Sequence, residues 1–151
     1  LLNNVLGGMG MSSRLNLSVR ERNGIAYTVD SNYIPLSDSG VFYIYFGTDE
    51  EKADRAERLI GRELKLLRER KMGVLQLHQA KRKFKGQIAL GEENRLNLVI
   101  ALAKNLLDYG RVQTLSEVFA NIDAVTAEQL LAIANEIFPD QGLSVLRFVP
   151  E

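Results

Sequence analysis

Residues 6–29 read LGGMGMSSRLNLSVRERNGIAYTV, and this stretch sets the order of elements around which the rest of the chain folds. The glycine-rich residues 7–10 end an apolar helix over residues 1–6, because glycine readily adopts the positive φ that closes a helix. A second, short helix begins with a serine cap and continues to about Arg22. Asn23-Gly24 is a strong stop signal, so we expect a sharp reversal before the chain becomes extended.

Two strands are expected after this reversal. Residues 25–36 are rich in β-branched and aromatic side chains, and a turn signal at residues 37–40 separates them from residues 41–48. Side chains alternate along the second strand, so that its two faces are distinct. One face carries Phe42, Ile44 and Phe46, and the other carries Val41, Tyr43 and Tyr45. We expect the two strands to form an antiparallel hairpin.

From Thr48 onward the apolar period becomes 3.6 residues, which predicts a succession of helices. The expected helices run from Thr48 to the break at Gly73 and over residues 75–90, 94–109, 114–122 and 126–138. Capping boxes are expected at Thr48–Glu51, Thr114–Glu117 and Thr126–Gln129. A closing strand is expected at Leu143–Val149. This order predicts an α+β fold in which helices cover an antiparallel sheet, and without repeats or long linkers we expect one domain over residues 1–151.

The composition is that of an ordinary globular protein and argues against several classes of function. Nineteen basic and nineteen acidic residues give a net charge of zero, which opposes a role in binding nucleic acid or anionic lipid. The chain has no cysteine, which excludes a disulfide scaffold and a thiolate site and fits both cytoplasm and periplasm. No apolar run is long enough to span a membrane. Since residues 1–6 read like the inside of a helix, we expect the chain to begin within an element of a longer polypeptide.

Leu6–Leu15 and Val19–Val29 resemble the C-terminal lobe of the M16 (pitrilysin or insulinase-like) zinc peptidases. The family pattern reads L-G-G-G-x-S-S-R-L, followed by R-E-x-x-G-x-A-Y-S. The chain departs from it by one extra residue in the glycine turn and by Thr28 in place of serine. Weaker similarity continues through the helices to Val125–Leu130, so the resemblance covers nearly the whole chain. It implies a single, partial M16 C-terminal-type domain whose N-terminal strands are missing.

The resemblance also implies how such a lobe takes part in catalysis. In the family the zinc motif H-x-x-E-H lies in the N-terminal lobe. The chain contains only His78, and one histidine cannot supply the roughly three protein ligands of a catalytic zinc. The resemblance therefore implies no cofactor in this chain, zinc on an N-terminal lobe or partner subunit, and no proteolysis by this fragment alone. It gives Arg20 and Tyr27 the role of hydrogen-bonding a peptide substrate near the scissile bond.

Several alternatives stay open at the level of sequence. The turn at Gly7, Gly8 and Gly10 can also touch peptide through its backbone, as the corresponding turn does in M16 relatives. The lobe can serve an active zinc endopeptidase, or it can be a catalytically inactive lobe with a structural or peptide-binding role. A basic module for nucleic acid would rest only on Lys81–Lys85, which has no aromatic stacking platform. Outside the motif, an arginine at a helix end and a tyrosine in a strand are ordinary structural residues.

Overall fold

The computed structural model describes residues 1–36, 38–139 and 143–149. Contacts within the chain divide it into two compact units. One, the sheet unit, consists of Leu2–Met72 and Ala127–Glu151, and the other, the helical unit, consists of Gly73–Thr126 together with Leu1. The elements form an α+β fold, as predicted, whereas a single domain over residues 1–151 stays a prediction.

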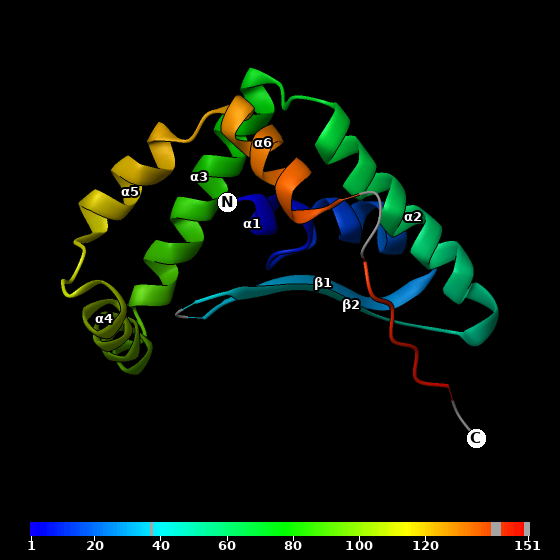
Figure 1. Cartoon of the computed structure of the whole chain (residues 1–151), viewed down its shortest axis with the longest axis horizontal. Coiled ribbons are helices and arrows are strands. Elements are labelled where there is room, and N and C mark those ends of the chain that lie inside the picture. The colour runs from blue at the N-terminus through cyan, green and yellow to red at the C-terminus, as the bar shows by residue number, and fades with distance from the viewer. Residues whose placement is uncertain (37, 140–142, 150–151) are drawn as a thin grey trace. The chain divides into compact units, whose positions relative to one another are not determined.

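The sheet unit is built around an antiparallel hairpin of β1 and β2. Its elements are α1 (Leu2–Leu6), the π-helix η1 (Asn16–Glu21), β1 (Ala26–Pro35), β2 (Gly40–Thr48), α2 (Glu50–Glu69) and α6 (Ala127–Ile137). Ser31 of β1 lies opposite Ile44 of β2. Val41, Tyr43 and Tyr45 are exposed, whereas Phe42, Ile44 and Phe46 face the interior, which confirms the two predicted faces. Figure 1 shows β1 and β2 as one long paired ribbon.

The core of the sheet unit forms where η1, α2 and α6 meet the inner side of the hairpin. Side chains at the centre of this core have almost no exposed surface: Leu6, Leu15, Val19, Ala56, Ala134 and Phe138. Phe138 packs edge-on against Phe42 of β2, with ring centroids 5.0 Å apart. The apolar period of 3.6 residues predicted from Thr48 onward is confirmed in α2, because Ala56, Ile60 and Leu64 are all buried.

The helical unit contains α3 (Val74–Glu92), α4 (Arg95–Tyr109) and α5 (Leu115–Ala124), close to the predicted bounds. Asn94 caps α4 by accepting from the amides of Leu96 and Asn97, and Gly110 ends that helix at φ 68°. The predicted capping box at Thr114 is present, with the amide of Glu117 donating to Oγ1 of Thr114 over 3.2 Å. Local signals of this kind therefore determine where these helices begin and end.

Three expectations about elements need correction. The helix expected up to Arg22 has π geometry over Asn16–Glu21, as the bond from the Arg22 amide to the Leu17 carbonyl, five residues earlier, illustrates. The N-cap of α2 is Asp49 rather than Thr48, whose hydroxyl donates to the Ile25 carbonyl over 2.6 Å instead. The described residues 143–149 form no strand.

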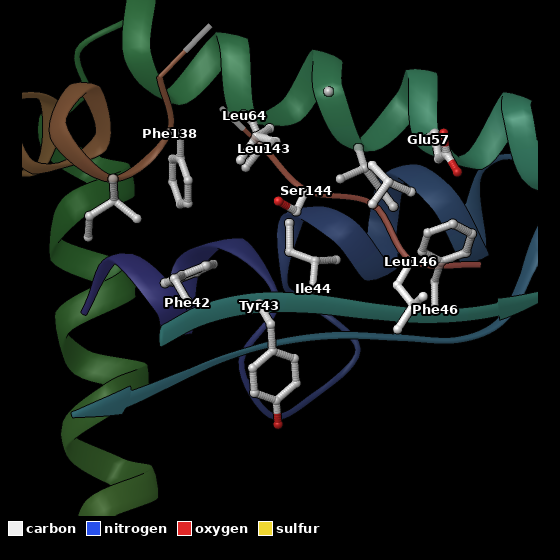
Figure 2. A pocket seen from close by; sticks show the side chains of 14 residues that line it. Phe42, Tyr43, Ile44, Phe46, Glu57, Leu64, Phe138, Leu143, Ser144 and Leu146 are labelled. Atoms are coloured by element: carbon white, nitrogen blue, oxygen red, sulfur yellow. The ribbon is translucent and has the colours of Figure 1, made fainter. Parts of the chain in front are cut away.

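The last described segment lies close to β2 and α2 although it forms no strand. Residues 143–146 line a cavity of about 390 Å³ together with residues of β2 and α2. Figure 2 shows this segment between α2 and β2, with Leu143, Ser144 and Leu146 among the residues that line the cavity. Arg147 holds it there through Glu57 at 2.7 Å and Asp54 at 2.7 Å, both on α2. These ion pairs hold the segment through a side chain, and the sheet formed by the described residues consists of β1 and β2 alone.

Candidate functional site

Arg20 lies in the last turn of η1, where the helix is wider than an α-helix. The amide of Arg22 donates to the carbonyl of Leu17 over 3.1 Å, a bond that spans five residues. Val19 points into the core and is fully buried, which leaves the neighbouring Arg20 exposed. The side chain of Arg20 keeps 44% of its surface exposed, and its Nε lies 3.9 Å from a carboxylate oxygen of Glu21. Its guanidinium is therefore accessible and only loosely paired.

A tight reversal follows Arg20 and leads into β1. The amide of Gly24 donates to the Arg20 carbonyl over 2.8 Å, and the amide of Ile25 donates to the Val19 carbonyl over 3.1 Å. Gly24 has φ 59°, a conformation that side chains with a Cβ rarely adopt. Asn23 donates from its side chain to the Ser18 carbonyl over 2.6 Å. The predicted Asn-Gly stop signal is thus confirmed, and it carries the chain directly from Arg20 to the start of β1.

A β-bulge lies at Tyr27, the second residue of β1. Ala26 pairs with Thr48 and Thr28 pairs with Gly47, so the pairing shifts between them and Tyr27 has no residue opposite. Bulges of this kind change the direction in which a side chain points and are common next to functional sites. Tyr27 and Thr28 are consequently both exposed, and 65% of the Tyr27 surface is accessible.

The hydroxyl of Tyr27 has a charged partner that the sequence did not reveal. It donates to Oδ1 of Asp49 over 2.5 Å, and Nζ of Lys52 donates to Oδ2 of the same carboxylate over 2.5 Å. The hydrogen bond to Asp49 raises the pKa of the Tyr27 phenol. Hydrogen bonds from Lys52 and then Tyr27 lower the pKa of Asp49. In the sequence, Asp49 at a helix start is typical of an N-cap, and Lys52 three positions later is typical of an ion pair along the helix. Neither signal points to Tyr27.

The glycine turn is explained by close packing. A Cβ on Gly7 would lie 2.6 Å from the backbone nitrogen of Ser31, and a Cβ on Gly8 would lie 2.6 Å from the Cα of Asn4. The amide of Ser31 donates to the Gly7 carbonyl over 3.1 Å, so the turn is joined directly to β1. Gly10 has φ 100°, which also favours glycine. The structure thus gives each of the three predicted glycines a local reason.

The remaining candidates show no arrangement that suggests chemistry. His78 is exposed on α3. Among the described residues, no three His, Cys, Asp or Glu side chains are grouped so as to hold a metal. Lys81 donates to the Asp123 carbonyl and Lys85 to its carboxylate, each over 2.8 Å, so part of the basic run is neutralised by α5. No helix in the described part of the chain is long and apolar enough to cross a membrane.

The chain is similar to curated proteins along most of its length. Its sequence is 34% identical over 140 residues to the uncharacterized zinc protease YmxG of Bacillus subtilis, covering 93% of this chain and 34% of that protein. It is 31% identical to an uncharacterized zinc protease of Streptomyces coelicolor, covering 91% of this chain and 30% of that protein. The chain therefore spans about a third of the length of these relatives.

Solved structures and a family model agree with these relatives. A conserved protein from Enterococcus faecalis matches with a TM-score of 0.74 and 28% identity, over 89% of this chain and 31% of that one. The peptidase M16 inactive domain from Pseudomonas fluorescens matches with a TM-score of 0.72 and 25% identity, over 89% of this chain and 32% of that one. Residues 1–84 match the family model described as the peptidase M16 inactive domain. The chain belongs to the M16 peptidase family and is a lobe of its C-terminal, inactive-domain type.

Proposed function

We propose that this chain is the substrate-binding lobe of an M16-like zinc endopeptidase. Arg20 and Tyr27 would bind peptide near the scissile bond, and zinc would be held by an N-terminal lobe on the same polypeptide or on a partner subunit. The observation that carries the proposal is the bulge in β1, which leaves the Tyr27 side chain exposed just beyond the reversal that follows Arg20. The naming of several relatives as zinc proteases supports the metal and the reaction class.

The two side chains suit the charge that develops during peptide hydrolysis. When bound on the other lobe, zinc would polarise the attacking water and the scissile carbonyl. The carbonyl oxygen then becomes negative, and a phenol O–H and a guanidinium N–H can both donate to it. Donors of this kind contribute most when water is excluded from the site. Arg20 and Tyr27 would therefore supply oxyanion stabilisation from a lobe that holds no zinc itself.

The glycine turn would add a backbone contact to the same peptide. Packing already requires glycine at residues 7 and 8, and the amides of both residues donate to the Asn3 carbonyl. A contact of these two residues with substrate would therefore use their carbonyl groups. Met9 and Met11, which flank Gly10, are largely exposed and could cover apolar peptide side chains. We include Gly7, Gly8 and Gly10 as the turn that contacts substrate.

The test is a single substitution in the intact protein, including its N-terminal lobe. Tyr27→Phe keeps the ring and removes the donor, and loss of one oxyanion donor reduces kcat by about 10²- to 10³-fold. Tyr109→Phe is a matched control, since Tyr109 is equally exposed on α4, outside the proposed site. The assay is hydrolysis of an unfolded polypeptide with zinc present. Wild-type kcat in Tyr27→Phe would show that the assignment is wrong.

A second candidate is a catalytically inactive lobe with a structural or peptide-binding role. The description of the matching family as an inactive domain favours it, as does the Tyr27 hydrogen bond to Asp49, which gives the tyrosine a structural partner. Zinc analysis of the intact protein separates the two functions. Stoichiometric zinc and an H-x-x-E-H motif in the N-terminal lobe support the peptidase, whereas the absence of both supports the inactive lobe.

A further inference from the structure

Asp49 occupies the N-cap of α2, yet its carboxylate does not cap that helix. Its backbone is extended, with φ −68° and ψ 147°, and within the described residues its side chain accepts no hydrogen bond from the first helical amides. Aspartate at this position ordinarily accepts from the second or third amide of the helix. Both of its oxygens are used by side chains instead, one by Tyr27 and one by Lys52. Asp49 thus contacts Tyr27, 22 positions away in the sequence, instead of capping its own helix.

From this contact we infer that Asp49 is a positioning residue, whose carboxylate holds the Tyr27 phenol at the start of β1 until a peptide carbonyl accepts its hydrogen bond. The inference rests on the proposed function, because it concerns how Tyr27 is presented to substrate. A tyrosine with 65% of its surface exposed has little packing to restrict its rotamers. The hydrogen bond to Asp49 supplies that restriction.

Lys52 makes it feasible for the phenol to change partners. The Tyr27 hydroxyl has one proton and can donate it either to Asp49 or to a peptide oxygen. When it turns to the peptide, Asp49 keeps its ion pair with Nζ of Lys52 at 2.5 Å and is not left as an isolated charge. One hydrogen bond is exchanged for another, and no proton leaves the phenol. Asp49, paired with Lys52, can thus lose the hydrogen bond from Tyr27 and accept it again after the peptide leaves.

The first arm of the test measures the phenol directly and does not depend on activity. In the intact protein with ¹³C-labelled tyrosine, Tyr27→Phe identifies the Tyr27 signal. The Tyr27 pKa should lie above its ordinary value of 10.0 in the wild type and fall toward that value in Asp49→Ala and Asp49→Asn. Asp38→Asn, a charge-matched change at the other end of the hairpin, should leave it unaltered. An equal Tyr27 pKa in wild type and Asp49→Ala would overturn the inference.

The second arm separates positioning from helix capping. Serine is a good N-cap but has a shorter side chain, whereas asparagine retains an acceptor at the length of aspartate. We expect Asp49→Ala and Asp49→Ser to lower kcat by about tenfold through loss of orientation, with KM little changed. Asp49→Asn should retain most of the activity. If Asp49→Ser were as active as wild type while Asp49→Ala was impaired, the residue would act on the helix and the inference would fail.

A double substitution distinguishes this inference from the function on which it rests. If Asp49 acts through Tyr27, Asp49→Ala should cause no further loss in protein that already carries Tyr27→Phe. A further tenfold loss there would overturn the inference. Impaired Tyr27→Phe with normal Asp49→Ala would leave the proposed function standing and remove the role of Asp49. Fully active Tyr27→Phe would refute the proposed function, even where the titration had established the contact.

Discussion

Gly7→Ala should destabilise the sheet unit, because no room exists for a methyl group between the glycine turn and β1. A Cβ there would lie 2.6 Å from the backbone nitrogen of Ser31 and 2.7 Å from its Oγ. Ser31 cannot retreat freely, since it is 2% exposed and its Oγ donates to Oδ1 of Asn3 over 2.7 Å. Overpacking costs about 1–3 kcal/mol and a weakened Ser31–Gly7 hydrogen bond about 1 more, so we expect a loss of about 2–4 kcal/mol.

Urea unfolding of the chain, followed by far-ultraviolet circular dichroism, measures this loss as a lower midpoint at unchanged slope. Gly61→Ala is the matched control, because Gly61 lies in the middle of α2 and a Cβ there meets nothing within 4 Å. It should stabilise the protein by about 0.5–1 kcal/mol, since alanine favours helix. If Gly7→Ala unfolded at the wild-type midpoint, the close approach would not be the reason for glycine, and peptide contact would become the better explanation.

Two further predictions concern the core and the polar group at Tyr27. Leu15→Ala removes a side chain with no exposed surface and should lower the free energy of unfolding by about 2–5 kcal/mol in the same urea assay; a loss below about 1 kcal/mol would contradict the packing of η1. Because the folded pKa of Asp49 is lowered, its contribution to stability is present above the ordinary pKa of 3.8 and disappears as pH falls through the lowered folded value. The raised pKa of Tyr27 acts in the opposite sense: its contribution is present below the ordinary pKa of 10.0 and disappears as pH rises through the raised folded value. Stability measured against pH in wild type and Asp49→Asn should differ in both windows, and identical curves would contradict the contact.

Local signals predicted most of the helices and the hairpin. The two faces of β2 follow from alternation alone, and α4 begins after Asn94 and ends at Gly110, as its capping residues indicate. The reversal at Gly24 was likewise evident, because an Asn-Gly pair has few other conformations that suit it. These features depend on residues that are neighbours in the sequence, which is why a single sequence contains them.

The features that define the candidate site depend on pairing across longer distances. Leu15 and Val19 share one face of either an α-helix or a short π-helix, so their spacing could not distinguish the two. The bulge at Tyr27 is determined by the register of β1 against β2, and no sequence motif in β1 predicts it. The sequence position of Asp49 suits a helix cap, and only the folded chain brings the Tyr27 phenol to its carboxylate. The prediction of a closing strand was wrong because the alternation of side chains does not show whether the backbone pairs with another strand.

The wide turn of η1 makes this segment tolerant of a change in chain length. A π-turn holds about one residue more than an α-turn, so removing one residue from Asn16–Glu21 would let the segment return to 3.6 residues per turn. The residues on either side would keep their faces, because the lost residue and the tighter turn offset each other. The same deletion in the middle of α2 would rotate every later residue of that helix by about 100° about its axis. A one-residue deletion in η1 should therefore lower the free energy of unfolding less than a deletion of Gly61 does.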